Sequence, residues 1–238
     1  MRNLDLTDCA VMGYQRARVC LVVLLVLAAA CGGRATHGAV TEPVRPRTIA
    51  VLGDSLSVSP SPDDSFPAVL QRRLEIEGHA WRVVSVGQNG DTTADGLARL
   101  DDLLEEQPHV LVLALGANDG LRGVPLDTVR QNLDTIISRA QAAGVRVLLC
   151  GMEAPPFNGL RYSLAFHFVF PDLAETYRLP LVPFLLTGVI GRRELNREDW
   201  VHPNARGAER IAETIWPVLE PMLAADADAQ PSDIRPNR

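Results

Sequence analysis

The 238-residue sequence has no run of basic residues, and its formal net charge at pH 7 is −6. A surface that binds nucleic acid needs clustered lysines and arginines, whereas the 23 basic residues of this chain are dispersed. No Gly-x-Gly-x-x-Gly fingerprint follows the first predicted strand, which argues against a domain that binds a dinucleotide. The sequence therefore excludes a nucleic-acid partner and disfavours a nucleotide cofactor.

Side chains that could bind a metal or cross-link the chain are also few. Of the four cysteines, Cys9 and Cys20 lie in the leader described below and Cys31 ends it, so an internal disulfide is excluded. The remaining Cys150 ends the apolar run Val147–Leu149 and is predicted to be a buried core residue rather than a nucleophile. Four histidines have no partner at metal-ligand spacing, so no metal site is predicted from them. They are His37, His79, His109 and His167.

The amino terminus has an apolar run that is too short for an ordinary membrane-spanning helix. Arg16 and Arg18 precede this run, Val19–Ala30, in a pattern typical of a secretory signal. The following Cys31, after two alanines, resembles the end of the bacterial lipobox, where cleavage precedes a cysteine that receives the lipid. The departure from that pattern is Ala28, which stands where leucine is usual. Residues 1–31 are therefore predicted to be the leader of an exported bacterial protein, periplasmic or anchored to the membrane through lipidated Cys31.

Two other interpretations of the leader remain open. One is a plain signal peptide cleaved nearby, and the other is a membrane anchor that is retained. The start of translation is open as well, because Met12 lies at a more usual distance from the arginines than Met1 does.

Composition divides the rest of the chain into three parts. Residues 32–47 are rich in Gly, Pro, Thr and Arg and are predicted to be a flexible tether. Residues 226–238 carry prolines and charges without an apolar period and are predicted to be a disordered tail. Between them, residues 48–225 are long enough for one sizeable α/β domain and too short for two.

Apolar strands alternate with helices of regular apolar spacing throughout this domain. The alternation predicts an α/β fold in which helices cover both faces of a five-stranded parallel sheet. The predicted strands are Ile49–Leu52, Trp81–Val86, Val110–Leu115, Arg146–Cys150 and Leu181–Phe184. The predicted helices span residues 67–77, the stretch around 97–104, and residues 126–143, 160–177 and 205–223, with Pro171 as a break or new start and Pro217 as a kink.

Four short polar segments follow strands or precede the last helix. Because the carboxyl ends of parallel strands share one edge of a sheet, these segments are expected to converge there. Each segment alone is compatible with a helix cap or a turn, so the prediction of a site depends on their occurring together. The segments are Gly53-Asp54-Ser55-Leu56, the loop around Gly90, Gly116-Ala117-Asn118-Asp119 and Asp199-Trp200-Val201-His202-Pro203.

These residue types are those that acyl transfer to water requires. A serine hydroxyl such as that of Ser55 is a weak nucleophile unless a base takes its proton, and His202 is the candidate base. Asp199, three residues earlier on the same loop, can orient the imidazole and stabilise its cation. The negative oxygen of the tetrahedral intermediate needs fixed donors, which the Ser55 and Gly90 N–H groups and the Asn118 side-chain amide could supply.

Together these residues resemble the SGNH hydrolase superfamily, also called GDSL esterases/lipases. Its four blocks match Ser55, Gly90, Asn118 and His202 in order, and the resemblance covers residues 48 to 223. Gly90-Asp91-Thr92 and the segment from Asn118 to Gly123 are most similar to the arylesterase, acyl-CoA thioesterase and lysophospholipase branch. The resemblance implies a three-layer α/β/α, flavodoxin-like fold and a serine esterase that needs no metal and no cofactor. Gln88-Asn89, where smaller or apolar residues are usual, puts the acyl-group specificity in question.

The sequence thus predicts hydrolysis of small-molecule carboxylic esters or thioesters, of small or medium acyl chains, through an acyl-serine intermediate. Deacetylation of carbohydrate is the alternative within the enzyme class, because it uses the same groups in a more open and polar pocket. A catalytically idle lipoprotein that binds lipid or glycan in the same groove is the alternative from another class.

Aromatic residues cluster after the fourth predicted strand. Most are expected to pack in the core, and the functional alternative is that they form one wall of an acyl pocket. They are Phe157, Tyr162, Phe166, Phe168 and Phe170.

Overall fold

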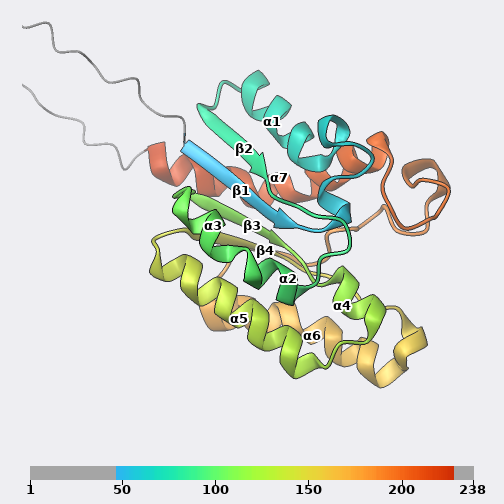
Figure 1. Ribbon diagram of the computed structural model, residues 1–238. Helices are drawn as coiled ribbons and strands as arrows, with labels where there is room; N and C mark the ends of the chain where they lie inside the picture. The colour runs from blue at the N-terminus through green and yellow to red at the C-terminus, as the bar shows by residue number, and fades with distance from the viewer. Residues whose placement is uncertain (1–46, 228–238) are drawn as a thin grey trace, which may run out of the picture. The chain divides into compact units, whose positions relative to one another are not determined.

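The computed structural model describes residues 47–227, in which five strands form one sheet with the order β2-β1-β3-β4-β5 (Figure 1). Every neighbouring pair of strands is parallel. This is the flavodoxin-like order of a doubly wound sheet, with the first strand inside the sheet rather than at its edge. The strands are β1 (Arg47–Gly53), β2 (Trp81–Ser85), β3 (Val110–Ala114), β4 (Arg146–Cys150) and β5 (Leu181–Val182).

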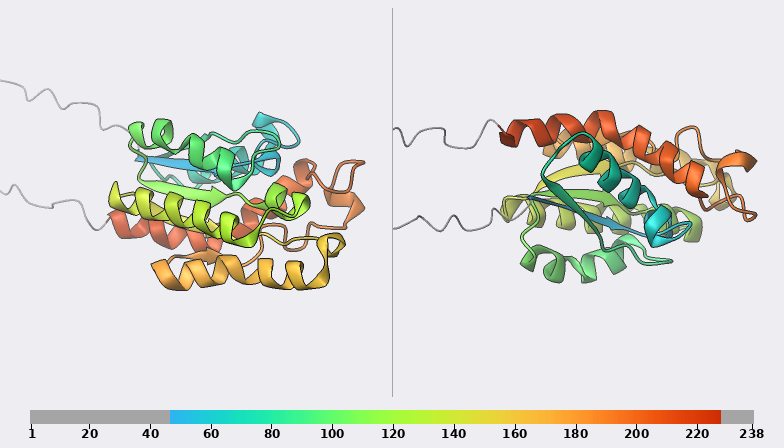
Figure 2. Two further views of the ribbon diagram at one scale, coloured as in Figure 1. Left: turned by 60° about the horizontal axis from the view of Figure 1, so that its bottom comes forward. Right: turned by 90° about the horizontal axis from the view of Figure 1, so that it is seen from above.

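Helices cover both faces of this sheet. On one face α1 packs on α7, whereas on the other face α2 and α6 pack on α5 (Figure 1, Figure 2). The predicted three-layer α/β/α fold with a five-stranded parallel sheet is therefore confirmed. The helices are α1 (Phe66–Ile76), α2 (Thr93–Ala98), α3 (Leu100–Glu105), α4 (Ala117–Arg122), α5 (Leu126–Ala142), α6 (Leu160–Tyr177) and α7 (Ala205–Ala227).

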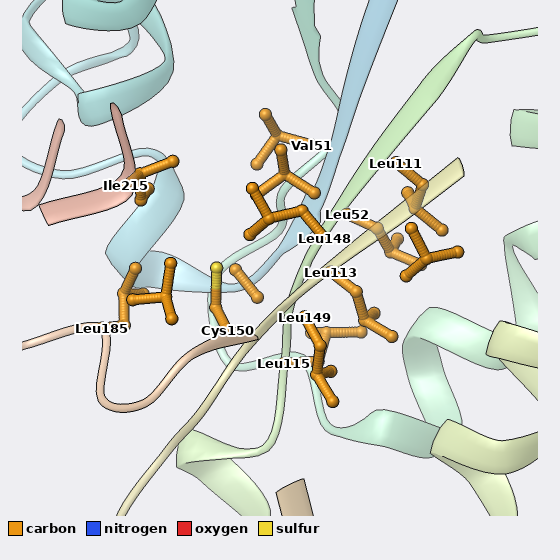
Figure 3. Packing of buried hydrophobic residues seen from close by; sticks show 14 of the residues in the cluster. Val51, Leu52, Leu111, Leu113, Leu115, Leu148, Leu149, Cys150, Leu185 and Ile215 are labelled. Carbon is orange, nitrogen blue, oxygen red and sulfur yellow. The ribbon is translucent and has the colours of Figure 1, made fainter. Parts of the chain in front are cut away.

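The core forms because the three inner strands, β1, β3 and β4, are largely apolar on both faces. All of β3 is buried, as predicted for a central strand. Leu52, Leu113 and Leu149 are in register on neighbouring strands and lie close together in the core (Figure 3). Cys150 is fully buried, and this burial raises the pKa of its thiol. The prediction that Cys150 is a core residue is confirmed.

The helix predicted around residues 97–104 is instead two helices, α2 and α3, which meet at Arg99. The backbone of Arg99 leaves helical geometry at φ −102° and ψ 2°. Its guanidinium reaches back to form an ion pair with Asp91 and to donate a hydrogen bond to the Val86 carbonyl. Because the leucine spacing continues across the break, periodicity alone could not reveal it.

The structure contains a helix, α4, between residues 104 and 126, where the sequence predicts none. After Gly116, whose φ of 119° suits glycine, the chain forms α4. The helix is too short and too polar to show an apolar period. Its Asp119 is fully buried and accepts hydrogen bonds from the Thr93 N–H (2.8 Å) and the Thr93 hydroxyl (2.7 Å). This contact joins α4 to the start of α2.

Prolines disturb the helices less than predicted and the last strand more. Neither Pro171 in α6 nor Pro217 in α7 interrupts its helix. Buried residues on both sides, such as Phe170 and Leu173 in α6, hold the helix against the sheet although one backbone hydrogen bond is lost. The fifth strand ends at Val182 rather than Phe184, because Pro183 has no N–H to donate to a neighbouring strand.

The predicted leader, with Cys31, and residues 32–46 of the predicted tether lie outside the described residues, as does the tail from residue 228. The first strand begins at Arg47, the last residue predicted for the tether, and α7 continues to Ala227, inside the predicted tail. Within residues 47–227, the structure has no helix that combines the length and apolar character needed to span a bilayer.

The sheet order determines where a site can form. The connection after β1 leads to β2 on one side, and the next strand, β3, lies on the other side of β1. Ligands of doubly wound sheets bind at such a switch point, outside the carboxyl ends of the strands. Ser55 follows β1 and Asn118 follows β3, so both lie next to this point.

Replacing Asp119 with alanine is expected to lower the free energy of unfolding by about 2–3 kcal/mol, because a buried N–H and a buried hydroxyl lose a charged acceptor. Urea denaturation monitored by circular dichroism measures this loss. Asp102→Ala is the matched control, since Asp102 is exposed on α3 and its removal should change stability by less than about 0.5 kcal/mol. Equal denaturation midpoints for the two variants would show that Asp119 does not hold α4 in place.

Candidate active site

The turn that ends β1 positions Ser55. Asp54 caps the short 3-10 helix η1 (Ser55–Ser57), accepting a hydrogen bond from the Leu56 N–H at 2.9 Å. The preceding Gly53 has no room for a side chain, because a Cβ there would lie 2.6 Å from the Ser57 Oγ. Ser55 is the first residue of this helical turn, and it lines a cavity of about 910 Å³.

His202 lies between Ser55 and Asp199. Its Nε2 is 2.9 Å from the Ser55 Oγ, and its Nδ1 is 2.8 Å from the Asp199 Oδ2. Because an ionised carboxylate only accepts hydrogen bonds, Nδ1 carries the proton and Nε2 accepts the hydrogen bond of the Ser55 hydroxyl. The structure therefore brings together three polar groups from two distant segments, in the arrangement that an activated serine requires.

Two backbone N–H groups hold the Asp199 carboxylate. Its Oδ1 accepts hydrogen bonds from His202 N (2.9 Å) and from Val201 N (3.0 Å). These two bonds lower the pKa of Asp199 to about 2, so the carboxylate is ionised at neutral pH. Trp200, between these residues, has a φ of 61°, which is rare for a residue with a bulky side chain.

Gly90 and Asn118 line the same cavity as Ser55. The φ of Gly90 is 82°, and neither its N–H nor that of Ser55 donates to another described residue. The Asn118 Nδ2 donates to the Asp91 carbonyl at 2.9 Å and makes a longer hydrogen bond, 3.3 Å, to the Asp54 Oδ2. The shorter bond fixes the amide, while the longer one leaves a proton that a ligand can take over. All three predicted oxyanion donors thus share one cavity.

Sequence reasoning gave no role at the site to Asp54, Arg99 or Arg122. Burial raises the pKa of Asp54 to about 7, and its carboxyl group touches the Asn118 amide. Arg122 donates a hydrogen bond to the Gly90 carbonyl at 2.8 Å, and Arg99 forms an ion pair with Asp91. The two arginines hold the backbone around Gly90. Asp54 and Arg122 carried a signal in the sequence, since Asp54 belongs to Gly53-Asp54-Ser55-Leu56 and Arg122 to the segment that resembles one branch of the family, whereas Arg99 carried none.

The lining of the cavity beside Ser55 is divided almost evenly between polar and apolar surface. Its apolar side chains are Val58, Pro60 and Pro62, all from the segment after Ser55. The rest of the lining includes Gln88, Asn89 and polar residues from the loop that ends at His202. The unusual Gln88-Asn89 pair therefore lies at the cavity, whose apolar side chains come from one short segment.

The aromatic cluster does not form a wall of this cavity. Phe166 and Phe170 are buried in the core, with ring centroids 5.7 Å apart, as expected for most of the cluster. The Tyr162 hydroxyl donates to the Val124 carbonyl at 2.8 Å. Phe157 and Phe168 are exposed, at 70% and 56%, and neither lines the cavity. The alternative of an aromatic acyl wall is therefore wrong.

One group that could offer metal ligands escaped the sequence analysis. Glu77 and His79 lie near Glu220, with their candidate ligand atoms within 4.8 Å of one another. Both carboxylates are exposed, and Arg73 already donates to Glu77 at 2.9 Å. Glu77 follows the end of α1, which returns from the Ser55 edge toward the start of β2. The group therefore lies away from Ser55 and has the character of a surface ion-pair cluster.

Comparison with known proteins gives a consistent result. Residues 51–210 match the model of the GDSL-like Lipase/Acylhydrolase family. The chain is 42% identical over 186 residues to "Esterase TesA" of Pseudomonas aeruginosa, covering 77% of this chain and 92% of that protein. It is 34% identical to "Thioesterase 1/protease 1/lysophospholipase L1" of Escherichia coli, covering 76% of this chain and 86% of that protein.

A solved structure supports the same relationship. The psychrotrophic esterase EstA from Pseudoalteromonas sp., in a structure inhibited by monoethylphosphonate, superimposes with a TM-score of 0.71 at 30% identity. The match covers 75% of this chain and 99% of that one. These relatives favour ester hydrolysis over carbohydrate deacetylation and over an idle binding protein. The chain therefore belongs to the GDSL-like lipase/acylhydrolase family, within the SGNH hydrolases, and is a serine esterase of the esterase, thioesterase and lysophospholipase type.

Proposed function

We propose that this esterase uses Ser55 as nucleophile, His202 as general base and acid, and Asp199 as the residue that orients His202. The observation that carries the proposal is the continuous hydrogen-bonded line from Ser55 through His202 to Asp199, at 2.9 and 2.8 Å. Asp199 keeps the proton on Nδ1, which leaves Nε2 to take the hydroxyl proton. No metal and no cofactor enters this scheme.

The reaction then runs in two steps. As His202 takes its proton, the Ser55 oxygen bonds to the carbonyl carbon, and the carbonyl oxygen becomes an oxyanion facing the Ser55 and Gly90 N–H groups and the Asn118 amide. His202 returns the proton to the alcohol or thiol as its bond to the acyl carbon breaks. A water molecule, activated in turn by His202, then releases the carboxylic acid and restores Ser55.

The size and lining of the cavity support small or medium acyl chains. Its volume of about 910 Å³ does not limit an ester of that size, and among the described residues its apolar side chains are Val58, Pro60 and Pro62. Beyond these three side chains a long acyl chain would lie against polar residues and water, with little further gain from apolar burial. Hydrolysis of p-nitrophenyl esters from acetate to palmitate tests this, with highest kcat/KM expected among the shorter chains.

Labelling with a fluorophosphonate complements the ester series, because this reagent reports an activated serine. Covalent modification of Ser55 is the expected result, found by mass spectrometry of the digested protein. The phosphonate-inhibited state of the Pseudoalteromonas esterase supports the choice of reagent. An unmodified Ser55 together with no hydrolysis of any ester, in protein shown to be folded, would contradict the proposal.

Acidification from pH 8 to pH 5 is expected to lower kcat/KM, because the buried Asp54 carboxyl gains a proton in this range and its negative charge no longer favours the imidazolium that His202 forms as it takes the Ser55 proton. Asp199, with a pKa of about 2, stays ionised throughout this range and cannot cause the loss. Asp54, whose pKa burial raises to about 7, does titrate there, so Asp54→Asn is the control. A fall of kcat/KM in Asp54→Asn as steep as that of the unmodified protein would contradict this role of Asp54.

We also propose that the protein is exported and carries a lipid on Cys31, with residues 32–46 as a tether to the membrane. The support is that basic residues precede an apolar run in the leader and that the end of the leader resembles a lipobox. Growth of bacteria expressing the full chain with an alkyne analogue of palmitate should label the protein, and Cys31→Ala should abolish the label. Cys20→Ala is the matched control, and equal labelling of both variants would contradict lipidation at Cys31.

A further inference from the structure

The wall of the Ser55 cavity contains a charge that the proposed reaction does not use. Arg197 lines this cavity together with His202 and Asp199, and it is exposed. The other two charged residues there pair with each other, at 2.8 Å. The Arg197 guanidinium forms no ion pair or hydrogen bond with any residue in the part of the chain that the structure describes. The cavity therefore presents one uncompensated positive charge.

Arg197 also lines a second, smaller cavity of about 250 Å³. The linings of the two cavities share Arg197, so a molecule that is bound at Ser55 and contacts this side chain lies near the second space. The smaller cavity is bounded by Trp200 and by a further arginine, Arg193, with Glu198 as its only acidic residue. Flat groups fit beside an indole, and anions fit beside two guanidinium groups.

The strained backbone of Trp200 suggests that its indole has a function at this position. Its φ of 61° costs a non-glycine residue about 1–3 kcal/mol, and a glycine would make the same turn without that cost. The turn is enforced on both sides, since Trp200 N donates to the Arg197 carbonyl (3.0 Å) and Arg197 N donates to the His202 carbonyl (2.8 Å). The strain holds a half-exposed indole, 49% accessible, two residues before His202.

The proposed mechanism indicates which part of the ester lies here. The carbonyl oxygen faces Gly90 and Asn118, whereas the leaving oxygen must face His202 to receive its proton. The Arg197 backbone is hydrogen-bonded to that of His202 and its side chain lines the same cavity, which favours a position beside the leaving group over one beside the acyl chain. With a net charge of −6 the whole chain repels anions, and a local guanidinium offsets this repulsion at the site.

We infer that Arg197 and Trp200 form a subsite for the alcohol part of the substrate, and that it selects esters of flat, aromatic alcohols carrying a negative charge such as a sulfonate or carboxylate. The inference rests on the proposed function, because it takes the orientation of the ester from the roles of Ser55 and His202. Arg197 acts in specificity and takes no part in the bond-breaking steps.

Two acetyl esters that differ in charge alone test this inference. The acetates of 4-hydroxybenzenesulfonate and 4-hydroxybenzenesulfonamide share the acyl group and the shape of the leaving group. The measured quantity is the ratio of kcat/KM for the anionic ester to that for the neutral ester. Arg197→Gln should lower this ratio about fivefold, and Arg197→Glu further, while kcat/KM for the neutral ester stays within about twofold. Added salt should lower the ratio of the unmodified protein and leave that of Arg197→Gln almost unchanged.

Arg192→Gln is the matched control, because it removes the same charge from the same loop. Arg192 faces Glu194 at 4.0 Å and lines neither cavity, so its replacement should leave the ratio unchanged. An unchanged ratio in Arg197→Gln, or an equal fall in Arg192→Gln, would overturn the subsite. Ser55→Ala distinguishes a failure of the proposed function from a failure of the subsite. If Ser55→Ala still hydrolyses the neutral ester, the proposed function is wrong. If Ser55→Ala is inactive but Arg197→Gln leaves the ratio of the two kcat/KM values unchanged, the subsite alone is refuted.

Trp200→Gly tests the other wall of the subsite, since glycine accepts the same φ without the indole. KM for both aryl esters should rise about fivefold with kcat little changed, as expected when binding contacts with the substrate are lost. Acetate esters of small aliphatic alcohols, which do not reach the indole, should show no such rise. A fall in kcat for all esters alike would instead show that Trp200 only shapes the His202 loop, and would remove it from the subsite.

Discussion

Replacement of Ser55 by alanine should lower kcat for a short p-nitrophenyl ester by about 10⁴- to 10⁶-fold while leaving KM nearly unchanged. The variant lacks the oxygen that bonds to the acyl carbon, so no acyl-serine can form. Substrate binding depends on the cavity walls, which the substitution leaves in place. Steady-state kinetics on the purified protein measure the loss, and circular dichroism verifies the fold. Ser61→Ala is the matched control: Ser61 lines the same cavity, and its loss should cost less than about tenfold.

His202→Ala should cost nearly as much as Ser55→Ala, since the two residues act as one unit across the 2.9 Å hydrogen bond. The double variant should therefore be no slower than Ser55→Ala alone. A double variant that loses the product of the two single effects would show that His202 acts independently of Ser55. Substantial activity in Ser55→Ala, with Ser61→Ala also active, would show that another group attacks the ester.

The fold was predictable from the sequence because its signals are local. The inner strands are apolar runs buried on both faces, and their alternation with helices is typical of a parallel sheet that helices cover on both sides. The errors came where a long-range contact decides local structure. Arg99 breaks a leucine-periodic helix because it bonds to Asp91, and α4 forms around a carboxylate that bonds to Thr93. The amino-acid pattern within neither segment indicates that Asp91 or Thr93 is the partner.

The positions of the candidate site residues were predictable for a different reason. Acyl transfer needs few residue types, and their positions at strand ends follow from the parallel sheet, so Ser55 and Asn118 could be placed before any geometry was known. The charged residues that support the site could not be placed from the sequence in this way. The burial of Asp54 and the reach of Arg122 to the Gly90 carbonyl depend on packing that the spacing of motifs does not contain. Arg197 was missed because a single exposed arginine in a loop carries no signal in the sequence.

Asn118→Ala should lower kcat by about 10²- to 10³-fold with little change in KM, because the amide meets a negative charge that exists only as the reaction proceeds. In the free protein the two Nδ2 protons bond to the Asp91 carbonyl at 2.9 Å and to the Asp54 Oδ2 at 3.3 Å. The oxyanion takes over the second, weaker bond, so little is lost when the amide turns to it. Asn89→Ala is the control, since Asn89 lines the cavity without a role in the proposed oxyanion hole, and should cost less than about tenfold.

The free energy of unfolding distinguishes the loss of the Asn118 amide as an oxyanion donor from a general disruption of the structure around Asn118. Losing the hydrogen bond to the Asp91 carbonyl should cost only about 1 kcal/mol, so Asn118→Ala should unfold in one cooperative transition at slightly lower urea concentration. Its reaction with a fluorophosphonate should slow as well, since that reaction also places negative charge on an oxygen in the hole. If KM rises while kcat is retained, Asn118 binds the ground-state ester, and the Ser55 and Gly90 N–H groups alone must stabilise the intermediate. That outcome would remove Asn118 from the oxyanion hole while leaving Ser55 and His202 in their roles.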